Sequence, residues 1–240
     1  MNIGRIMLVL GAALVASILL ANPACAQAAP AASVMAAGDA VIFEGRIDAT
    51  STAAVLRLLQ TSPITRLIIT SGGGDVAAAL DMADAIRAHQ LDIEVPRACL
   101  SSCANYIFPA GRRKTLGRPD AVGWHGNMAH VLHLLRTGQE HLTEGQVDSA
   151  RQLAARESAF YTGIGVDGFV CWFGKLAPND VEDFYWLSVA DMARFGIRDV
   201  TVVTPATVTA PDPQMRELRV DADALETARR AARPSDRPPA

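Results

Sequence analysis

The chain has 240 residues, of which 50% are hydrophobic and only 5% aromatic, and its formal net charge is -3. This length suits one domain with a sizeable hydrophobic core. The slight excess of acidic residues argues against a nucleic-acid partner, because nucleic-acid binding relies on concentrated positive charge.

Residues 1–26 have the pattern of a secretory signal peptide. Arg5 is the only charge before an apolar run over 6–20, and Ala24-Cys25-Ala26 follows with the small residues of a signal-peptidase site. We expect cleavage before Gln27, which removes Arg5, changes the formal charge from -3 to -4 and leaves a periplasmic or secreted protein. An uncleaved membrane anchor is the alternative, but an apolar run of about fifteen residues is short for a membrane span.

Hydrophobic periodicity and turn residues predict an α/β domain over residues 39–204. Residues 27–38 show no period and predict a flexible start, and the Pro-rich segment 205–240 predicts a poorly ordered tail outside the core, with a helical turn around 222–232. We expect strands over 40–47, 66–70, 92–99, 121–124 and 199–204, and helices over 50–60, 75–89, 103–110 and 146–161, with a short helix from Ser188. Ser51 or Thr52 is the expected cap of the first helix, and Thr143 begins a capping box at the longest helix.

The strand over 66–70 runs directly into a glycine turn, Ser71-Gly72-Gly73-Gly74-Asp75, followed by an amphipathic helix. Strand, turn and helix form half of a βαβ unit. Gly72, Gly74 and Ala77, with Glu94 downstream, also satisfy a dinucleotide-binding pattern. We expect no cofactor, because an exported protein rarely meets free nicotinamide nucleotide.

A hydroxyl and an imidazole accompany this turn. Ser102 lies in Cys99-Leu100-Ser101-Ser102-Cys103, and His125 ends the strand over 121–124. A nucleophile, a base and open backbone N–H groups are what acyl transfer requires. Ser101 is the adjacent rival nucleophile. The structural alternatives are Ser102 as a helix cap and His125 as an ordinary histidine at a strand end.

Export favours disulfides, and cleavage leaves three cysteines, Cys99, Cys103 and Cys171. We expect the pair Cys99–Cys103, since a strand end and a helix start can bring such positions within bridging range. If Cys103 were unpaired, its thiol at a helix N-terminus would be another candidate nucleophile. His130 and His133 share one helical face near His125 and His141, but no carboxylate-bearing zinc motif is present, which predicts a solvated face and no metal.

Four segments together resemble the proteolytic subunit of the Clp protease. They are Ile69-Thr70-Ser71-Gly72-Gly73-Gly74-Asp75, Leu100-Ser101-Ser102-Cys103-Ala104-Asn105 ending at Ala110-Gly111, Val122-Gly123-Trp124-His125, and the segment 180–188 with Phe195-Gly196-Ile197. The resemblance covers about residues 40–203, with the motifs in the family's order. It departs at Gly72, which replaces a proline, at Asp75 beside the glycine turn, and at Cys103, which replaces a methionine or small residue.

The resemblance implies a single domain of stacked ββα units of the Clp/crotonase type, with a protruding long helix. It implies that Ser102 attacks, that His125 takes the proton and that Asp180 orients the imidazole, with Asp183 and Glu182 as competing acids. The N–H groups of Gly73 and Cys103 would form the oxyanion hole. The family implies a peptide or protein substrate and self-association through the helix matching 146–161. An exported member would have no ATPase unfoldase as partner.

Two functions therefore follow from the sequence. The first is an exported serine peptidase or acyl hydrolase, and the second is a catalytically silent domain that binds a peptide or another envelope protein. A third reading is crotonase-like acyl-thioester chemistry that uses only the two N–H donors.

Overall fold

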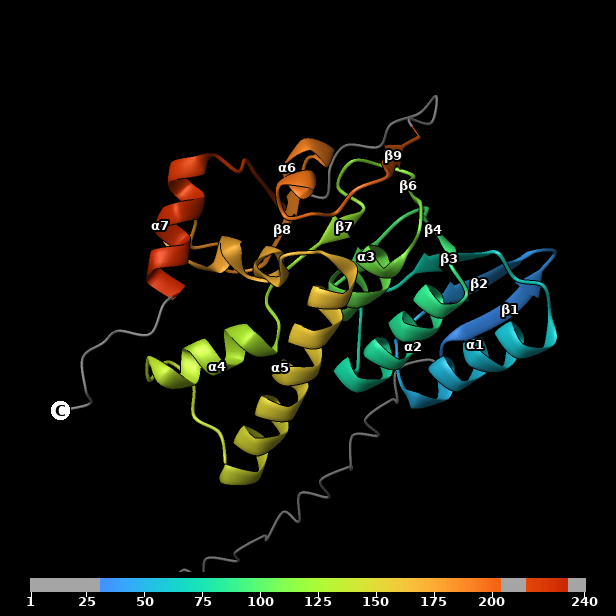
Figure 1. The fold of residues 1–240 in the computed structure, drawn as a ribbon, viewed down its shortest axis with the longest axis horizontal. Coiled ribbons are helices and arrows are strands. Elements are labelled where there is room, and N and C mark those ends of the chain that lie inside the picture. Colours follow the sequence, from blue (N-terminus) through green and yellow to red (C-terminus); the bar gives the residue numbers. More distant parts are fainter. Residues whose placement is uncertain (1–30, 204–214, 233–240) are drawn as a thin grey trace, which may run out of the picture.

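The computed structural model describes residues 31–203 and 215–232 and has an α/β architecture in which strands and helices alternate (Figure 1). The strands are β1 (Ser33–Ala37), β2 (Ala40–Glu44), β3 (Arg66–Thr70), β4 (Asp92–Val95), β5 (Cys99–Leu100), β6 (Lys114–Leu116), β7 (Val122–Gly123), β8 (Phe184–Leu187), β9 (Val200–Val202) and β10 (Met215–Leu218). The α-helices are α1 (Ala49–Thr61), α2 (Val76–Ala88), α3 (Phe108–Ala110), α4 (Met128–Arg136), α5 (Glu144–Ile164), α6 (Val189–Arg194) and α7 (Ala222–Ala232). A π-helical segment, Cys103–Ile107, precedes α3, and two 3₁₀ segments, Gly168–Cys171 and Phe173–Lys175, follow α5.

The main sheet has six strands in the order β1-β2-β3-β4-β6-β9. β1 pairs antiparallel with β2, and the other neighbours are parallel. Parallel neighbours need a crossover connection, and α1 and α2 supply it for β2-β3-β4. β3 has the bounds predicted from its β-branched run, and its Leu67 and Ile69 are fully buried.

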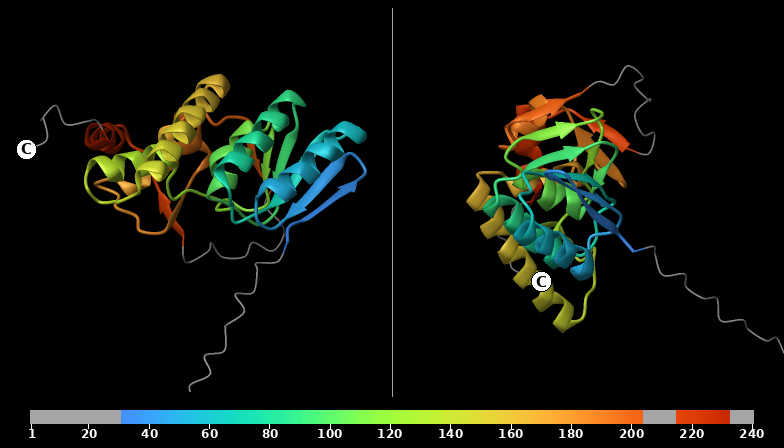
Figure 2. Two further views of the ribbon diagram at one scale, coloured as in Figure 1. Left: turned by 90° about the horizontal axis from the view of Figure 1, so that it is seen from below. Right: turned by 90° about the vertical axis from the view of Figure 1, so that its right-hand side faces the viewer.

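Three helices, α1, α2 and α5, lie side by side along one side of the sheet (Figure 2). α2 presents buried Ala78, Ala79 and Ala83, whose small side chains allow close packing. α1 begins earlier than predicted: Asp48 is its cap, and Ser51 completes a capping box from inside the helix. The predicted capping box of Thr143 at the start of the long helix is confirmed, and α5 extends to 21 residues.

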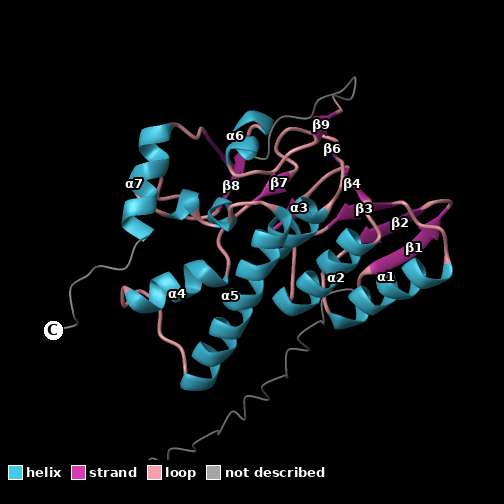
Figure 3. Ribbon diagram, in the orientation of Figure 1, coloured by secondary structure: helices cyan, strands magenta, loops and turns pink. Residues whose placement is uncertain are grey.

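The remaining strands form two short pairs, β5-β7 and β10-β8, and a bridge between Ser71 and Cys99 connects the end of β3 to β5 (β7 and β8 are labelled in Figure 3). β5 pairs with β7, an isolated bridge joins Trp124 to Tyr185 of β8, and β8 pairs with β10. We predicted one strand over 92–99, but the strand divides at Pro96, since proline has no N–H to donate to a sheet. The second half, β5, therefore leaves the main sheet and pairs with β7.

Two expectations about the flanks of the chain were wrong. The segment predicted as a flexible start contains β1, which pairs with β2 from Ser33 to Ala37. The segment predicted as a tail outside the core contains β10 and α7, and Leu218, Val220 and Ala228 are buried in the core. The predicted helix over 222–232 is confirmed as α7, whereas α4 was not predicted as an element.

The predicted signal peptide, 1–26, lies outside the described residues. Within 31–203 and 215–232, no helix is long and apolar enough to cross a membrane.

Candidate active site

Ser101 lies at the turn where β5 ends and the following helix begins. Its backbone is left-handed, with φ of 54°, although it is not a glycine. Its N–H donates to the Gly123 carbonyl at 3.1 Å, and its own carbonyl accepts from the Asn105 N–H at 2.8 Å. A non-glycine residue with positive φ at a strand-to-helix turn is strained, and such turns often present a nucleophile.

His125 lies directly after β7, the strand that pairs with β5. Its Nε2 is 2.7 Å from the Ser101 Oγ. The Phe184 ring packs beside the imidazole, with centroids 4.5 Å apart. The pairing of β5 with β7 therefore brings a hydroxyl and an imidazole into hydrogen-bond contact.

Ser102 points away from this pair. It is 3% exposed, and its hydroxyl donates to the Gly74 carbonyl at 2.8 Å. It forms no side-chain cap on the helix. The hydrogen bond that the predicted Ser102–His125 pair requires is absent from the described structure. Adjacent residues at the turn project in different directions, and the left-handed backbone of Ser101 turns Ser101, rather than Ser102, toward the imidazole.

The predicted carboxylate partner is not beside His125. Asp180 is exposed and has a positive φ of 45°, and its N–H donates to the Leu176 carbonyl. The rival acids Glu182 and Asp183 are also exposed, and their backbone carbonyls accept hydrogen bonds from the Lys175 ammonium at 2.5 and 2.7 Å. Among the described residues, His125 has no hydrogen bond or ion pair with any of these three acids.

Desolvation and a nearby cation, rather than an acid, set the pKa of the imidazole. Desolvation lowers the pKa of His125, although the residue remains exposed, and the positive charge of Lys175 lowers it further. His130 is affected by the same two causes and by its histidine neighbours, and its pKa falls to about 4. Both imidazoles are therefore neutral at neutral pH, and a neutral imidazole is the form that can accept a proton.

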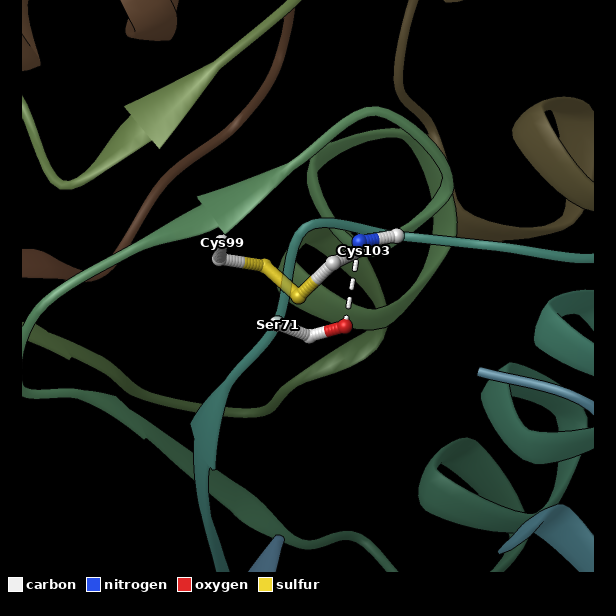
Figure 4. Close-up of a disulfide and its surroundings, with 4 residues drawn as sticks. Ser71, Cys99 and Cys103 are labelled. Atoms are coloured by element: carbon white, nitrogen blue, oxygen red, sulfur yellow. Dashed lines mark hydrogen bonds between the residues drawn. A yellow bond between two sulfur atoms is a disulfide. The ribbon is translucent and has the colours of Figure 1, made fainter. Parts of the chain in front are cut away.

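The glycine turn packs directly against Ser101. A Cβ on Gly73 would lie 2.7 Å from the Leu100 carbonyl and 2.9 Å from the Ser102 nitrogen, so this close approach requires glycine. The Gly73 N–H, predicted as an oxyanion donor, donates to the Ser71 hydroxyl at 3.0 Å instead, as Figure 4 shows beside the disulfide. With Ser101 as the attacking residue, the N–H that follows it is that of Ser102, one position before the predicted Cys103.

The disulfide between Cys99 and Cys103 is present, as predicted. The two cysteines are four positions apart, and Ser101 and Ser102 lie between them. The disulfide therefore holds the end of β5 against the start of the helix (Figure 4). Cys103 therefore has no thiol to act as a nucleophile. Cys171 is a free, buried cysteine, and its sulfur is 2.9 Å from the Tyr161 hydroxyl.

The histidines of α4 do not form the predicted solvated face. His133 is buried, and both His130 and His133 pack on the Trp172 ring, with centroids 5.5 and 5.2 Å away. Within the part of the chain that the structure describes, no group of three or more metal-ligating side chains converges.

Comparison of the chain with models of protein families and with curated proteins gives no match. The resemblance to the Clp proteolytic subunit therefore stays a prediction. Sequence reasoning did not find Lys175, Phe184 or Asn105 as site residues. Lys175 before β8 and Phe184 at the start of β8 were visible in the sequence as a positive charge and an aromatic residue, but nothing in their spacing connected them to His125.

Proposed function

We propose that this protein is an exported serine hydrolase, of peptidase or related acyl-hydrolase type, in which Ser101 is the nucleophile and His125 is its general base. The observation that supports this proposal best is the 2.7 Å contact between the Ser101 Oγ and the His125 Nε2 at a strained turn. Ser101 is half-buried, so a substrate can reach it, whereas Ser102 is buried and its hydroxyl is engaged by Gly74.

In this mechanism His125 takes the hydroxyl proton as the Ser101 Oγ attacks a carbonyl carbon. The Ser102 N–H, in the first turn of the helix, stabilises the oxyanion that develops. The imidazolium then gives the proton to the leaving group, and water hydrolyses the acyl-enzyme with His125 again as base. Because no acid orients His125 among the described residues, packing on Phe184 and the hydrogen bond to Ser101 hold the ring.

We further propose that the domain is of the Clp/crotonase type and acts on a peptide or protein substrate without an ATPase partner. The order of glycine turn, Ser101 and His125 along the chain, together with their convergence in space, supports this assignment. Self-association through α5 belongs to the same proposal, and the polar, exposed first half of that helix leaves room for a partner subunit.

The test is covalent labelling with a fluorophosphonate probe, which reacts with activated serines. The mature chain from Gln27 should be labelled, Ser101→Ala should abolish labelling, and His125→Ala should lower its rate by roughly 100-fold or more. Ser102→Ala is the matched control, since it removes the neighbouring hydroxyl and only one hydrogen bond. Labelling that survives in Ser101→Ala but is lost in Ser102→Ala would assign the nucleophile to Ser102 instead.

A catalytically silent peptide-binding domain is the second candidate function. The specific observation in its favour is that His125 lacks a carboxylate partner within the described residues, since the orienting acid contributes strongly in hydrolases that use a triad. No labelling of folded wild-type protein would favour this second function.

A further inference from the structure

Glu157 of α5 is a buried carboxylate that the mechanism above does not use. It is 2% exposed, and a buried charge is costly unless it is hydrogen-bonded. Its partners are all donors. The Tyr106 hydroxyl and the Met128 N–H donate to its Oε1, the latter at 3.1 Å, and the Ala129 N–H donates to its Oε2 at 3.3 Å. The carboxylate therefore joins two segments that lie outside its own helix.

These two segments adjoin the proposed nucleophile and the proposed base. Tyr106 is fully buried and lies in the π-helical segment that begins just after Ser101 and Ser102. Met128 and Ala129 begin α4, three and four residues after His125. A carboxylate that is bonded to both segments fixes how far apart they lie.

The first turn of α4 is the place where Glu157 holds the backbone. The first N–H groups of a helix have no partner within the helix. The Asn127 side chain accepts from the His130 N–H at 3.1 Å, and Glu157 accepts from the two N–H groups before it. Negative charge is also favourable at a helix N-terminus. Met128 lines a cavity of about 260 Å³ beside the proposed nucleophile, so the helix start that Glu157 holds is part of the wall of the site.

We propose that Glu157 is a positioning residue of this site, which holds the backbone after His125 against the segment that carries Ser101. The imidazole is thereby kept within hydrogen-bond distance of the hydroxyl. In a triad the acid bonds to the imidazole itself, whereas Glu157 acts through backbone N–H groups. The Asn105 side chain supports the same stretch, since its Nδ2 donates to the Gly126 carbonyl at 2.8 Å. This inference rests on the proposed function of Ser101 and His125.

The experiment compares fluorophosphonate labelling rates of folded wild-type protein with those of two Glu157 variants. Glu157→Asp keeps the charge but is one methylene shorter, so it should lose the backbone contacts and label about 10- to 100-fold more slowly. Glu157→Gln keeps the length and an acceptor oxygen, so it should stay within about fivefold of wild type. Arg156→Met is the matched control, because the neighbouring Arg156 reaches Asp81 and Asp84 of α2, and it should stay within about twofold.

A second pair of variants tests the backbone contact without changing Glu157. Met128 is the first residue of α4, a position that tolerates proline, and Asn127 before it is extended, as the residue before proline must be. Met128→Pro removes the N–H that donates to Glu157, whereas Met128→Ala shortens the same side chain and keeps the N–H. Met128→Pro should label about tenfold more slowly than Met128→Ala.

Nitrogen-15 NMR of the His125 imidazole separates positioning from stability, because its Nε2 signal reports the hydrogen bond to Ser101. In Glu157→Asp this signal should move toward that of Ser101→Ala. Labelled wild-type protein with a Glu157→Asp variant of unchanged rate and signal would overturn the positioning role and leave the proposed function standing. Equal losses in Glu157→Asp and Arg156→Met, or equal rates for the two Met128 variants, would also overturn it. Folded wild-type protein that is not labelled would overturn both.

Discussion

The pKa of His125 is set by desolvation and by one neighbouring charge. In many hydrolases a carboxylate beside the histidine stabilises the imidazolium and raises its pKa. Here desolvation and the Lys175 ammonium lower the pKa of His125. Lys175 is itself held by the carbonyls of Glu182 and Asp183, so its position is fixed by the same segment that was predicted to supply an acid. The site is therefore biased toward the neutral base.

The pH dependence of Ser101 labelling follows from this arrangement. Only neutral His125 can accept the proton, so labelling should rise with pH, with a midpoint below the ordinary histidine value of 6.5. Lys175→Met removes a charge that disfavours the imidazolium, so the pKa of His125 should rise and the midpoint should move to higher pH. Lys175→Arg, which keeps the charge, is the control. An unchanged midpoint in Lys175→Met would contradict the electrostatic role of Lys175.

At the scale of elements, the site depends on three segments, the glycine turn, β5 and β7, which contact one another through backbone hydrogen bonds. The Ser71 N–H donates to the Ala98 carbonyl, and the Leu100 N–H donates to the Ser71 carbonyl, so the glycine turn runs beside β5. The Ser101 N–H then donates to Gly123 at the end of β7. The turn, β5 and β7 are thereby joined by hydrogen bonds up to the residue that carries the hydroxyl.

Two neighbouring glycines provide a matched test of this close approach. A Cβ on Gly73 would lie 2.8 Å from the Ser101 Cβ, and its φ is 93°, whereas a Cβ on Gly72 would meet nothing within 4 Å. Gly73→Ala should displace the Ser101 turn and lower the labelling rate by roughly 100-fold, because small misplacements of reacting groups are costly. Gly72→Ala should stay within about twofold of wild type. Equal rates for the two variants would mean that the turn does not position Ser101.

At the scale of the whole molecule, the disulfide and the predicted signal peptide are both consistent with export to an oxidising compartment. A disulfide at the site requires an oxidising compartment, which export would supply. In the described structure Cys99 and Cys103 pair and Cys171 is buried and free, and the predicted cleavage before Gln27 would remove Cys25, the fourth cysteine of the chain.

Thiol counting by alkylation and intact mass therefore tests processing and pairing together. Protein isolated after export should begin at Gln27 and show one reactive thiol when unfolded without reductant, and three after reduction. Native protein should react slowly, because Cys171 is buried and its thiol pKa is raised by desolvation. Two thiols in the unfolded, unreduced chain would indicate that residues 1–26 remain attached.

Local sequence signals were sufficient for much of the framework. The β-branched run of β3, the amphipathic pattern of α2 and the capping box of α5 depend on neighbours within a few residues, and each element lies where it was predicted. β1 and β10 were missed because their stability comes from pairing with β2 and β8, and such pairing is not encoded in the strand itself.

The sequence by itself determined the α/β class and the residue types needed for acyl transfer, because these depend on periodicity and chemical identity, and it led us to expect the Cys99–Cys103 pair that the structure contains. Only the tertiary structure decided which serine meets His125. A left-handed backbone at Ser101 directs one hydroxyl to the imidazole and leaves Ser102 bonded to Gly74. The same holds for Lys175, whose proximity to His125 results from the packing of segments separated by fifty residues of chain.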